Sequence, residues 1–251
     1  MTFETAIIIR TRNEEKWIGA VLEKLLRQTY RDFEIVIVDS GSIDKTLEIA
    51  RKYPVKVVQI KPEEFTYPYA LNVGIRNTVA TRYLVMLSAH SLPISDTWLA
   101  DGLENFKKYD KLMGVYGFVR ALPGTGFWDW FFLEARGGMR RLISGKKFVT
   151  EVVERSGMGI MGFTNAVIPK ELWEQYPFNE KFAAGGEDGD WVNHWLKKGY
   201  RAVKDEQFTV RHSHELGLLG WYKQFKYWEL IAKPLPFEKK KLKFRKTEWV
   251  K

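Results

Sequence analysis

Three continuous apolar runs, separated by segments of helical periodicity, constrain the fold of this chain more than any other sequence feature. Ala6 to Ile9, Phe33 to Val38 and Tyr83 to Leu87 have the pattern of strands covered on both faces, and Val55 to Ile60 is predicted as a further strand. Apolar residues from Trp17 to Leu26 instead recur at helical spacing. Strands that alternate with helices predict an α/β fold whose central sheet is mostly parallel and flanked by helices.

Polar residues follow three of these strands, in the stretches Arg10 to Glu14, Asp39 to Ser42 and Ser88 to Ser91. In an open parallel sheet the ligand binds outside the carboxyl ends of the strands. The carboxylate of Asp39 can accept hydrogen bonds from a ribose or a base edge, and the two arginines of the first stretch can contact a base or a diphosphate. The alternatives are a helix cap for the aspartate and ordinary surface charge for the arginines.

Three of the four histidines are candidates for binding a metal ion. His90 follows a predicted strand, and a neutral imidazole is a good ligand for ions such as Mn²⁺. His212 and His214 alternate along another predicted strand, so both are expected to project from one face. The pattern predicts a partial metal shell, with a hydrogen-bonded His-x-His pair as the alternative. His194 falls inside a predicted helix and is expected to be structural.

Three carboxylates, Glu187, Asp188 and Asp190, lie within four residues among glycines at the start of a predicted helix. Backbone N–H groups at a helix N-terminus stabilise the ionised form of a carboxylate. An ionised carboxylate at this position can act as the general base on a hydroxyl group. The alternative is that Asp188 or Asp190 caps the helix.

The segment from Phe127 to Lys147 is aromatic at first and then basic. Because it contains glycines, we expect a mobile flap or a surface-lying segment rather than one rigid helix. Two short strands are predicted from Arg201 to Lys204 and from Phe208 to Arg211. Asn13 is predicted to cap the first helix.

Residues 218–251 form a basic, aromatic segment that we expect to pack on the 1–217 domain or to lie on a membrane surface. Seven of the nine excess positive charges lie from Trp221 to Lys251, which contains ten Lys/Arg and three Glu residues. Aromatic rings with nearby cations suit an anionic membrane. A helix packed on the core is the alternative. We expect no nucleic-acid partner, because no recognised nucleic-acid motif accompanies the basic residues.

Cysteine is absent, which excludes disulfides, thiolate metal sites and cysteine nucleophiles. No apolar stretch approaches the ~20 residues of a membrane span, and the N-terminus has no signal-peptide pattern. We therefore expect a cytoplasmic protein that can also associate with the inner face of the cell membrane.

Four segments, in order, resemble motifs of the family 2 glycosyltransferases over nearly all of residues 5–215. IIIRTRNEE resembles the opening strand and nucleotide loop, and FEIVIVDSGSIDKTLEIA resembles the second strand with its nucleotide-binding aspartate. YALNVGIRN resembles the segment beneath the donor, and FNEKFAAGGEDGDWVNHWLKKGYRAV resembles the region of the general base. The resemblance implies a GT-A fold and an inverting mechanism. The absence of a Gln-x-x-Arg-Trp motif resembles members that add a single sugar.

The resemblance also implies roles for particular residues. Asp39 is expected to bind the nucleoside of a nucleotide-sugar donor, and Asp188, beside Glu187, is expected to be the general base that activates a glycan or lipid-linked acceptor. The remaining residues of the nucleotide pocket are then Arg10, Thr11, Arg12, Asn13, Glu14, Ser88 and Ala89.

The metal motif departs from the family pattern. The usual Asp-x-Asp is Ser88-Ala89-His90 in this chain. Related enzymes with an Asp-x-His motif and a downstream histidine imply that His90, with His212 or His214, holds a divalent cation, Mn²⁺ or Mg²⁺. Such an ion stabilises the departing nucleoside diphosphate.

Two other functions fit parts of the pattern. A sugar nucleotidyltransferase also uses an α/β nucleotide-binding sheet, but the stretch RTRNEE lacks the glycines that its loop would need. A catalytically silent nucleotide-sugar-binding protein would explain the altered metal motif, but the Glu187-Asp188 pair is intact.

Overall fold

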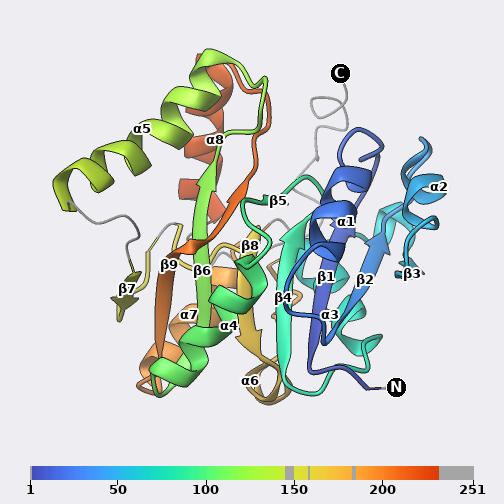
Figure 1. The fold of residues 1–251 in the computed structure, drawn as a ribbon, viewed down its shortest axis with the longest axis horizontal. Coiled ribbons are helices and arrows are strands. Elements are labelled where there is room, and N and C mark those ends of the chain that lie inside the picture. The colour runs from blue at the N-terminus through green and yellow to red at the C-terminus, as the bar shows by residue number, and fades with distance from the viewer. Residues whose placement is uncertain (1, 145–149, 158, 183–184, 232–251) are drawn as a thin grey trace.

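The computed structural model describes residues 2–144, 150–157, 159–182 and 185–231 (Figure 1). Helices cover both faces of one nine-stranded sheet. The strands are β1 Thr5–Thr11, β2 Phe33–Asp39, β3 Lys56–Gln59, β4 Tyr83–Ser88, β5 Leu92–Pro93, β6 Leu112–Arg120, β7 Thr150–Val153, β8 Asn165–Pro169 and β9 Arg201–Arg211. The α-helices are α1 Ile18–Leu26, α2 Thr46–Ala50, α3 Tyr67–Arg76, α4 Trp98–Lys108, α5 Phe127–Ser144, α6 Lys170–Gln175, α7 Glu187–Lys197 and α8 Leu218–Ile231.

The sheet has the order β3-β2-β1-β4-β8-β6-β9-β5, and β7 pairs with β9. The first four strands pair in parallel, and so do β6 and β9. The predicted α/β fold is therefore confirmed. One feature that the sequence did not predict is β8, which lies antiparallel between β4 and β6 and joins the two parallel parts.

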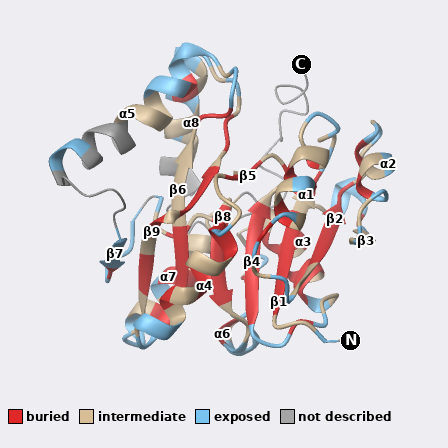
Figure 2. Ribbon diagram, in the orientation of Figure 1, coloured by how far each residue is buried: buried red, intermediate tan, exposed pale blue. Residues whose placement is uncertain are grey.

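Strand β1 shows how the sheet separates two hydrophobic cores. Successive side chains of a strand point to opposite faces. Accordingly Ala6 and Ile8 pack with residues of α3, α6 and α7, whereas Ile7 and Ile9 pack with residues of α1, α2 and α4. All four side chains are completely buried, and the central strands form the buried middle of the molecule (Figure 2). Burial on both faces explains why this strand is a continuous apolar run.

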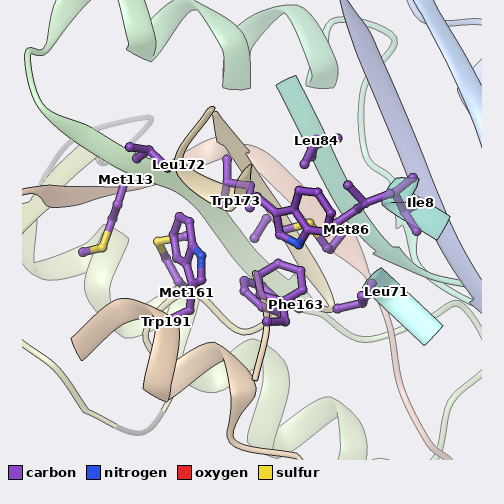
Figure 3. Packing of buried hydrophobic residues seen from close by; sticks show 14 of the residues in the cluster. Ile8, Leu71, Leu84, Met86, Met113, Met161, Phe163, Leu172, Trp173 and Trp191 are labelled. Carbon is purple, nitrogen blue, oxygen red and sulfur yellow. The ribbon is translucent and has the colours of Figure 1, made fainter. Parts of the chain in front are cut away.

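The first of these cores is rich in aromatic and sulfur-containing side chains. Trp191 of α7 and Trp173 of α6 lie around Phe163 and Met161, and Ile8 and Leu71 flank the same cluster (Figure 3). The indole N–H of Trp173 donates to the side-chain oxygen of Asn72, and that of Trp191 donates to the carbonyl of Tyr176. Buried rings with satisfied N–H groups fix α6 and α7 on this face of the sheet.

The predicted flap is instead a helix, α5, which runs from Phe127 to Ser144. Glycine in a helix interior costs only about 1 kcal/mol relative to alanine, and tertiary contacts in the first half of α5 offset that cost. Phe132 packs against Trp221 and Phe225 of α8, with ring centroids 5.1 and 5.7 Å apart. The prediction was wrong because local composition does not report these long-range contacts.

Three smaller predictions were also wrong. β9 is one strand of eleven residues, with an irregular register opposite Gly117 and Val119 of β6, where two strands were predicted. His212 and His214 follow that strand instead of lying within it. Asn13 does not cap α1, which begins at Ile18. Its backbone has a φ of 55°, and its side-chain oxygen accepts a hydrogen bond from the backbone of Ile43.

The C-terminal segment is described as far as residue 231. Within it, Trp221 is buried and packs against Phe132 of α5. The basic stretch from residue 232 to 251, on which the membrane prediction partly depended, lies outside the described residues. None of the described helices has both the length and the apolar character needed to cross a bilayer.

Candidate active site

The carboxyl ends of β1, β2 and β4 meet at one edge of the sheet. Thr11 at the end of β1 is opposite Asp39 of β2, and Arg10 is opposite Ser88 of β4. The three polar stretches that the sequence singled out therefore lie side by side, as expected for strands that are parallel neighbours. Ala89, the residue after β4, is buried.

The buried carboxylate of Asp39 orders the turn that follows β2. It accepts hydrogen bonds from the backbone N–H groups of Gly41 and Ser42, both at 3.1 Å, and from the Ser42 hydroxyl. That hydroxyl oxygen in turn accepts from the backbone N–H of Asn13 at 2.9 Å. Gly41 has a φ of +86°, a conformation that favours glycine. Asp39 thus orders this turn and does not cap the next helix, α2, whose N-cap is Lys45. Its predicted contact with a nucleoside stays a prediction.

The residues between β1 and α1 have different environments. Thr11 is buried, and its hydroxyl has no hydrogen-bond partner among the described residues. Arg12 is exposed at the strand end. The backbone N–H of Glu14 donates to the Thr46 hydroxyl at 2.6 Å. This loop is consequently held against the segment after β2, and Arg12 and Lys16 are its exposed cations.

His90, His212 and His214 form one cluster, although more than a hundred residues separate the first from the other two. The rings of His90 and His212 stack with centroids 4.3 Å apart, and the Nε2 atoms of His212 and His214 are 3.0 Å apart. One ligand atom from each ring lies within 4.8 Å of the others. The Nε2 atom of His90 is buried and has no partner among the described residues. Such a set of imidazoles suits a borderline divalent cation.

Neighbouring oxygen atoms orient two of these rings. The Nδ1 atom of His90 lies 2.9 Å from the Glu14 carboxylate, and the Nδ1 atom of His212 lies 3.1 Å from the Ser91 hydroxyl. Metal-binding histidines usually have a carboxylate or another oxygen on their second nitrogen. Glu14, which the sequence assigned to the nucleotide pocket, is therefore found beside the histidine cluster.

Two rings of the cluster, His212 and His214, favour the neutral form. Burial lowers the pKa of His212 well below its ordinary value, and the neighbouring His90 and His214 lower it further. Burial and His90 lower the pKa of His214 to about 4, against the opposing effect of Asp129. Neutral imidazole is the form that binds a metal ion, so protons compete weakly for these two nitrogens at neutral pH.

A second group of charges lies where α7 begins. Arg10 is 3.6 Å from the buried Glu187 carboxylate, and its guanidinium lies over the ring of Tyr67, 4.9 Å from the ring centroid. Arg10 lies opposite Ser88, the last residue of β4. The contact between Arg10 and Glu187 therefore places the start of α7 near the end of β4, which is followed by Ala89 and His90.

Burial raises the pKa of both adjacent carboxylates. The pKa of Glu187 rises to about 8, because burial and the neighbouring charge of Asp188 outweigh the attraction of Arg10. The pKa of Asp188 is also raised, mainly by burial, although the Gly189 N–H bonds to this carboxylate. Neither Asp188 nor Asp190 caps the helix. The N-cap is Gly186, at a φ of 97°, and Asp190 accepts a hydrogen bond from the Tyr176 hydroxyl.

Asp129 is a buried site residue that the sequence reasoning missed. Its carboxylate accepts hydrogen bonds from the backbone N–H groups of Glu215 and Leu216, at 2.7 and 3.0 Å. It also accepts from the Trp221 indole at 2.7 Å and from the Thr125 hydroxyl at 2.9 Å. Asp129 thereby fixes the segment just after His214. The one available signal was a single acidic residue within an aromatic run.

Helix α8 also approaches the carboxylates. Burial raises the pKa of the Tyr227 hydroxyl, and the charges of Tyr67 and Glu187 add to that effect. The helix that was expected to belong to a separate C-terminal segment thus lies near the Glu187 side of the site.

This chain is similar in sequence to a known protein family and to individual proteins. Residues 6–176 match the family described as glycosyl transferase family 2. A dolichyl N-acetyl-alpha-D-glucosaminyl phosphate 3-beta-D-2,3-diacetamido-2,3-dideoxy-beta-D-glucuronosyltransferase of Methanococcus voltae is 34% identical over 128 residues, 47% of this chain and 39% of that protein. A PGL/p-HBAD biosynthesis glycosyltransferase of Mycobacterium bovis is 34% identical over 97 residues, 37% of this chain and 38% of that protein. The chain spans about two fifths of the length of these relatives.

Solved structures show a similar fold at lower sequence identity. The mannosyltransferase PcManGT from Pyrobaculum calidifontis, in complex with GDP-Man and Mn²⁺, has a TM-score of 0.60 at 19% identity, covering 90% of this chain and 61% of that chain. S. aureus TarS 1-349 in complex with UDP-GlcNAc has a TM-score of 0.63 at 19% identity, covering 92% and 66%.

Proposed function

Because the chain belongs to glycosyl transferase family 2, we propose that it is an inverting enzyme that moves a single sugar from a nucleotide-diphosphate donor to an acceptor hydroxyl. Its fold is the GT-A fold. The observation that carries the proposal is the 3.6 Å contact between Arg10 and Glu187, which links the carboxyl groups of α7 to the strand ends beside His90. A base and a cation site at one edge of a nucleotide-binding sheet are what glycosyl transfer requires.

The donor binds, in this proposal, at the carboxyl ends of β1, β2 and β4. The structural relatives in complex with GDP-Man and UDP-GlcNAc support a nucleotide-sugar as the ligand. The exposed guanidinium of Arg12 is suited to the diphosphate. Asp39 holds the turn of Gly41 and Ser42 beside the nucleoside.

Asp188 acts as the general base. The acceptor hydroxyl gives its proton to this carboxylate while its oxygen attacks the anomeric carbon. The bond from that carbon to the diphosphate breaks on the opposite face, and nucleoside diphosphate leaves. Burial raises the pKa of Asp188 above its ordinary value, and a more basic carboxylate accepts a proton more readily.

His90, His212 and His214 would hold a divalent cation, and the unpartnered Nε2 atom of His90 supports this fit. Such an ion supplies charge stabilisation for the departing diphosphate. The all-imidazole set favours Mn²⁺ over Mg²⁺, which prefers oxygen ligands. The carboxylate of Glu14 lies beside the Nδ1 atom of His90 and thereby orients the His90 ring.

The acceptor is a glycan or a lipid-linked hydroxyl, and the protein acts in the cytoplasm at the inner face of the cell membrane. The dolichyl-phosphate substrate in the name of the Methanococcus voltae relative supports a lipid-linked acceptor.

Substitution of Asp188 tests this function. Asp188→Asn removes the base, and transfer is expected to fall by roughly 10²–10⁴-fold, while donor binding is retained. Asp190→Asn is the matched control, because that carboxylate lies in the same helical turn but bonds to Tyr176. Its transfer rate is expected to stay within a few fold of wild type. Turnover of Asp188→Asn at the wild-type rate would falsify the assignment of the base.

The product separates this proposal from its rivals. Release of nucleoside diphosphate together with a glycosylated acceptor is expected. Pyrophosphate as the product would identify a sugar nucleotidyltransferase. Tight donor binding without any turnover would identify a catalytically silent binding protein.

A further inference from the structure

The first turn of α5 carries four large aromatic side chains that face solvent. Phe127, Trp128, Trp130 and Phe131 are 63%, 36%, 52% and 43% exposed. At 3.6 residues per turn these positions share one face of the helix, and Asp129 points the opposite way. Since Asp129 is completely buried, the orientation of this turn is fixed, and its rings are presented outward.

Helix α8, which packs against α5, also exposes apolar side chains. Leu218, Leu219 and Tyr222 are 48%, 76% and 62% exposed. Trp221 and Phe225 of α8 contact Phe132 of α5, with ring centroids 5.1 and 5.7 Å apart. The two helices lie together at one end of the molecule (Figure 1). We call the seven exposed residues of α5 and α8 the aromatic surface.

We propose that the aromatic surface docks on an anionic lipid bilayer. Tryptophan, phenylalanine and tyrosine rings favour the boundary between headgroups and acyl chains. An extended apolar surface of this kind is costly to leave in water and marks an interaction site. Among the described residues, these seven side chains are between 36% and 76% exposed.

The charges around the aromatic surface select an anionic bilayer. Of the acidic side chains described on α5 and α8, Asp129 is buried, and Glu134 is within 3.8 Å of Arg211. After Glu134, the rest of α5 contains Arg136, Arg140 and Arg141 and no further acidic residue. On α8, the side chains of Lys223 and Lys226 are exposed. Basic segments next to interfacial rings are attracted to anionic headgroups.

Asp129 connects this surface to the histidine cluster. The same carboxylate that fixes the first turn of α5 accepts a hydrogen bond from Glu215, the residue after His214. A bilayer held by the rings of that turn therefore lies close to the candidate metal site. The inference rests on the proposed function in one respect only, since a lipid-linked acceptor explains why the surface and the site are adjacent.

Vesicle flotation with the full-length chain tests the proposal. The wild-type protein is expected to float with vesicles of phosphatidylcholine and phosphatidylglycerol, and much less with phosphatidylcholine alone. The double variant Trp128→Ser, Trp130→Ser is expected to partition about tenfold less, because interfacial binding scales with the apolar area inserted. Val79→Ser is the matched control, since Val79 is 48% exposed but lies after α3. It is expected to float like wild type.

Three outcomes would overturn the proposal. If wild type stays in solution with anionic vesicles, or if the double variant floats as wild type does, the aromatic surface is not the docking site. Sedimentation without lipid is the second measurement. A concentration-dependent dimer that the double variant abolishes would make the surface a contact between copies of this chain. Transfer to a water-soluble acceptor, unchanged in the double variant, separates failure of docking from failure of the proposed function.

Discussion

At the residue scale, side chains of the candidate site owe their positions to partners that are distant in the sequence. Glu14 orients the ring of His90, which lies 76 residues later in the sequence. Arg10, near the N-terminus, contacts Glu187, which lies in the last third of the sequence. Each of these groups is wholly or largely buried, where an electrostatic interaction is stronger than in water. Small changes at these positions should therefore have measurable effects on protonation and stability.

The Glu187 carboxyl makes stability depend on pH. Its pKa is raised from 4.5 to about 8 in the folded protein. Between these values the native state keeps a proton that the unfolded state has lost, so stability is greatest at the acidic end and falls as pH rises toward about 8. The wild type is expected to lose up to about 1.4 kcal/mol per pH unit in this window.

Glu187→Gln removes this proton equilibrium. Denaturant unfolding at several pH values between 5 and 8, roughly the window set by linkage, is expected to show a flatter profile for the variant. Parallel profiles for the two proteins would show that Glu187 ionises normally in the native state.

At the element scale, the contact between β6 and β9 requires a glycine. A Cβ atom at Gly117 would lie 1.5 Å from the carbonyl oxygen of Phe208 and 2.5 Å from the Asn165 amide nitrogen. That amide donates to the same carbonyl. Backbone atoms in a central sheet have little freedom to move away, and β6 carries an irregular register at this point.

Gly117→Ala is therefore expected to destabilise the protein by about 3 kcal/mol or more, the upper range for overpacking. The control is Gly126→Ala, because a Cβ atom there meets nothing within 4 Å. Equilibrium unfolding in denaturant measures both variants. Similar stability of the two would mean that the β6–β9 contact is wider than the structure indicates.

Asp129 joins α5 to the segment that follows β9, and Asp129→Asn tests that connection. An asparagine has one acceptor oxygen in place of two and turns an NH₂ group toward existing donors. The loss of charge-assisted hydrogen bonds is expected to cost about 1.5–3 kcal/mol of stability. Because the displaced segment carries His214, Mn²⁺ affinity should fall by roughly 10–100-fold.

Isothermal titration with Mn²⁺ measures this effect without catalysis. Trp221→Phe is the comparison, since it removes one donor to Asp129 but leaves the carboxylate. A smaller loss of affinity is expected there. Wild-type Mn²⁺ affinity in Asp129→Asn would contradict the positioning role.

At the scale of the whole molecule, the candidate metal site joins two segments that are distant in the sequence. His90 lies between β4 and β5, and His212 and His214 follow β9, with which β5 pairs. An ion bound by all three histidines would bind only the folded chain. Folding and metal binding should therefore be linked.

Mn²⁺ is expected to stabilise the fold by about 2.7 kcal/mol at a concentration one hundred times its Kd. A higher Tm in thermal unfolding, reversed by a chelator, is the measurement. His212→Ala should abolish the increase, and Mg²⁺ should give a smaller one. An equal increase in Tm for wild type and His212→Ala would show that the ion binds at another site.

The sequence by itself determined β1, β2 and β4, because a strand buried on both faces must be continuously apolar. The sequence also located β3 and the helices between the first four strands. It also located the polar strand ends and the carboxylates of Glu187 and Asp188. Only the tertiary structure decided that β8 enters antiparallel, that residues 127–144 form a helix, and that Asp129 lies behind the segment carrying His214. These features depend on contacts between residues far apart in the chain, and hydrophobic periodicity reports burial but not the partner against which a residue is buried.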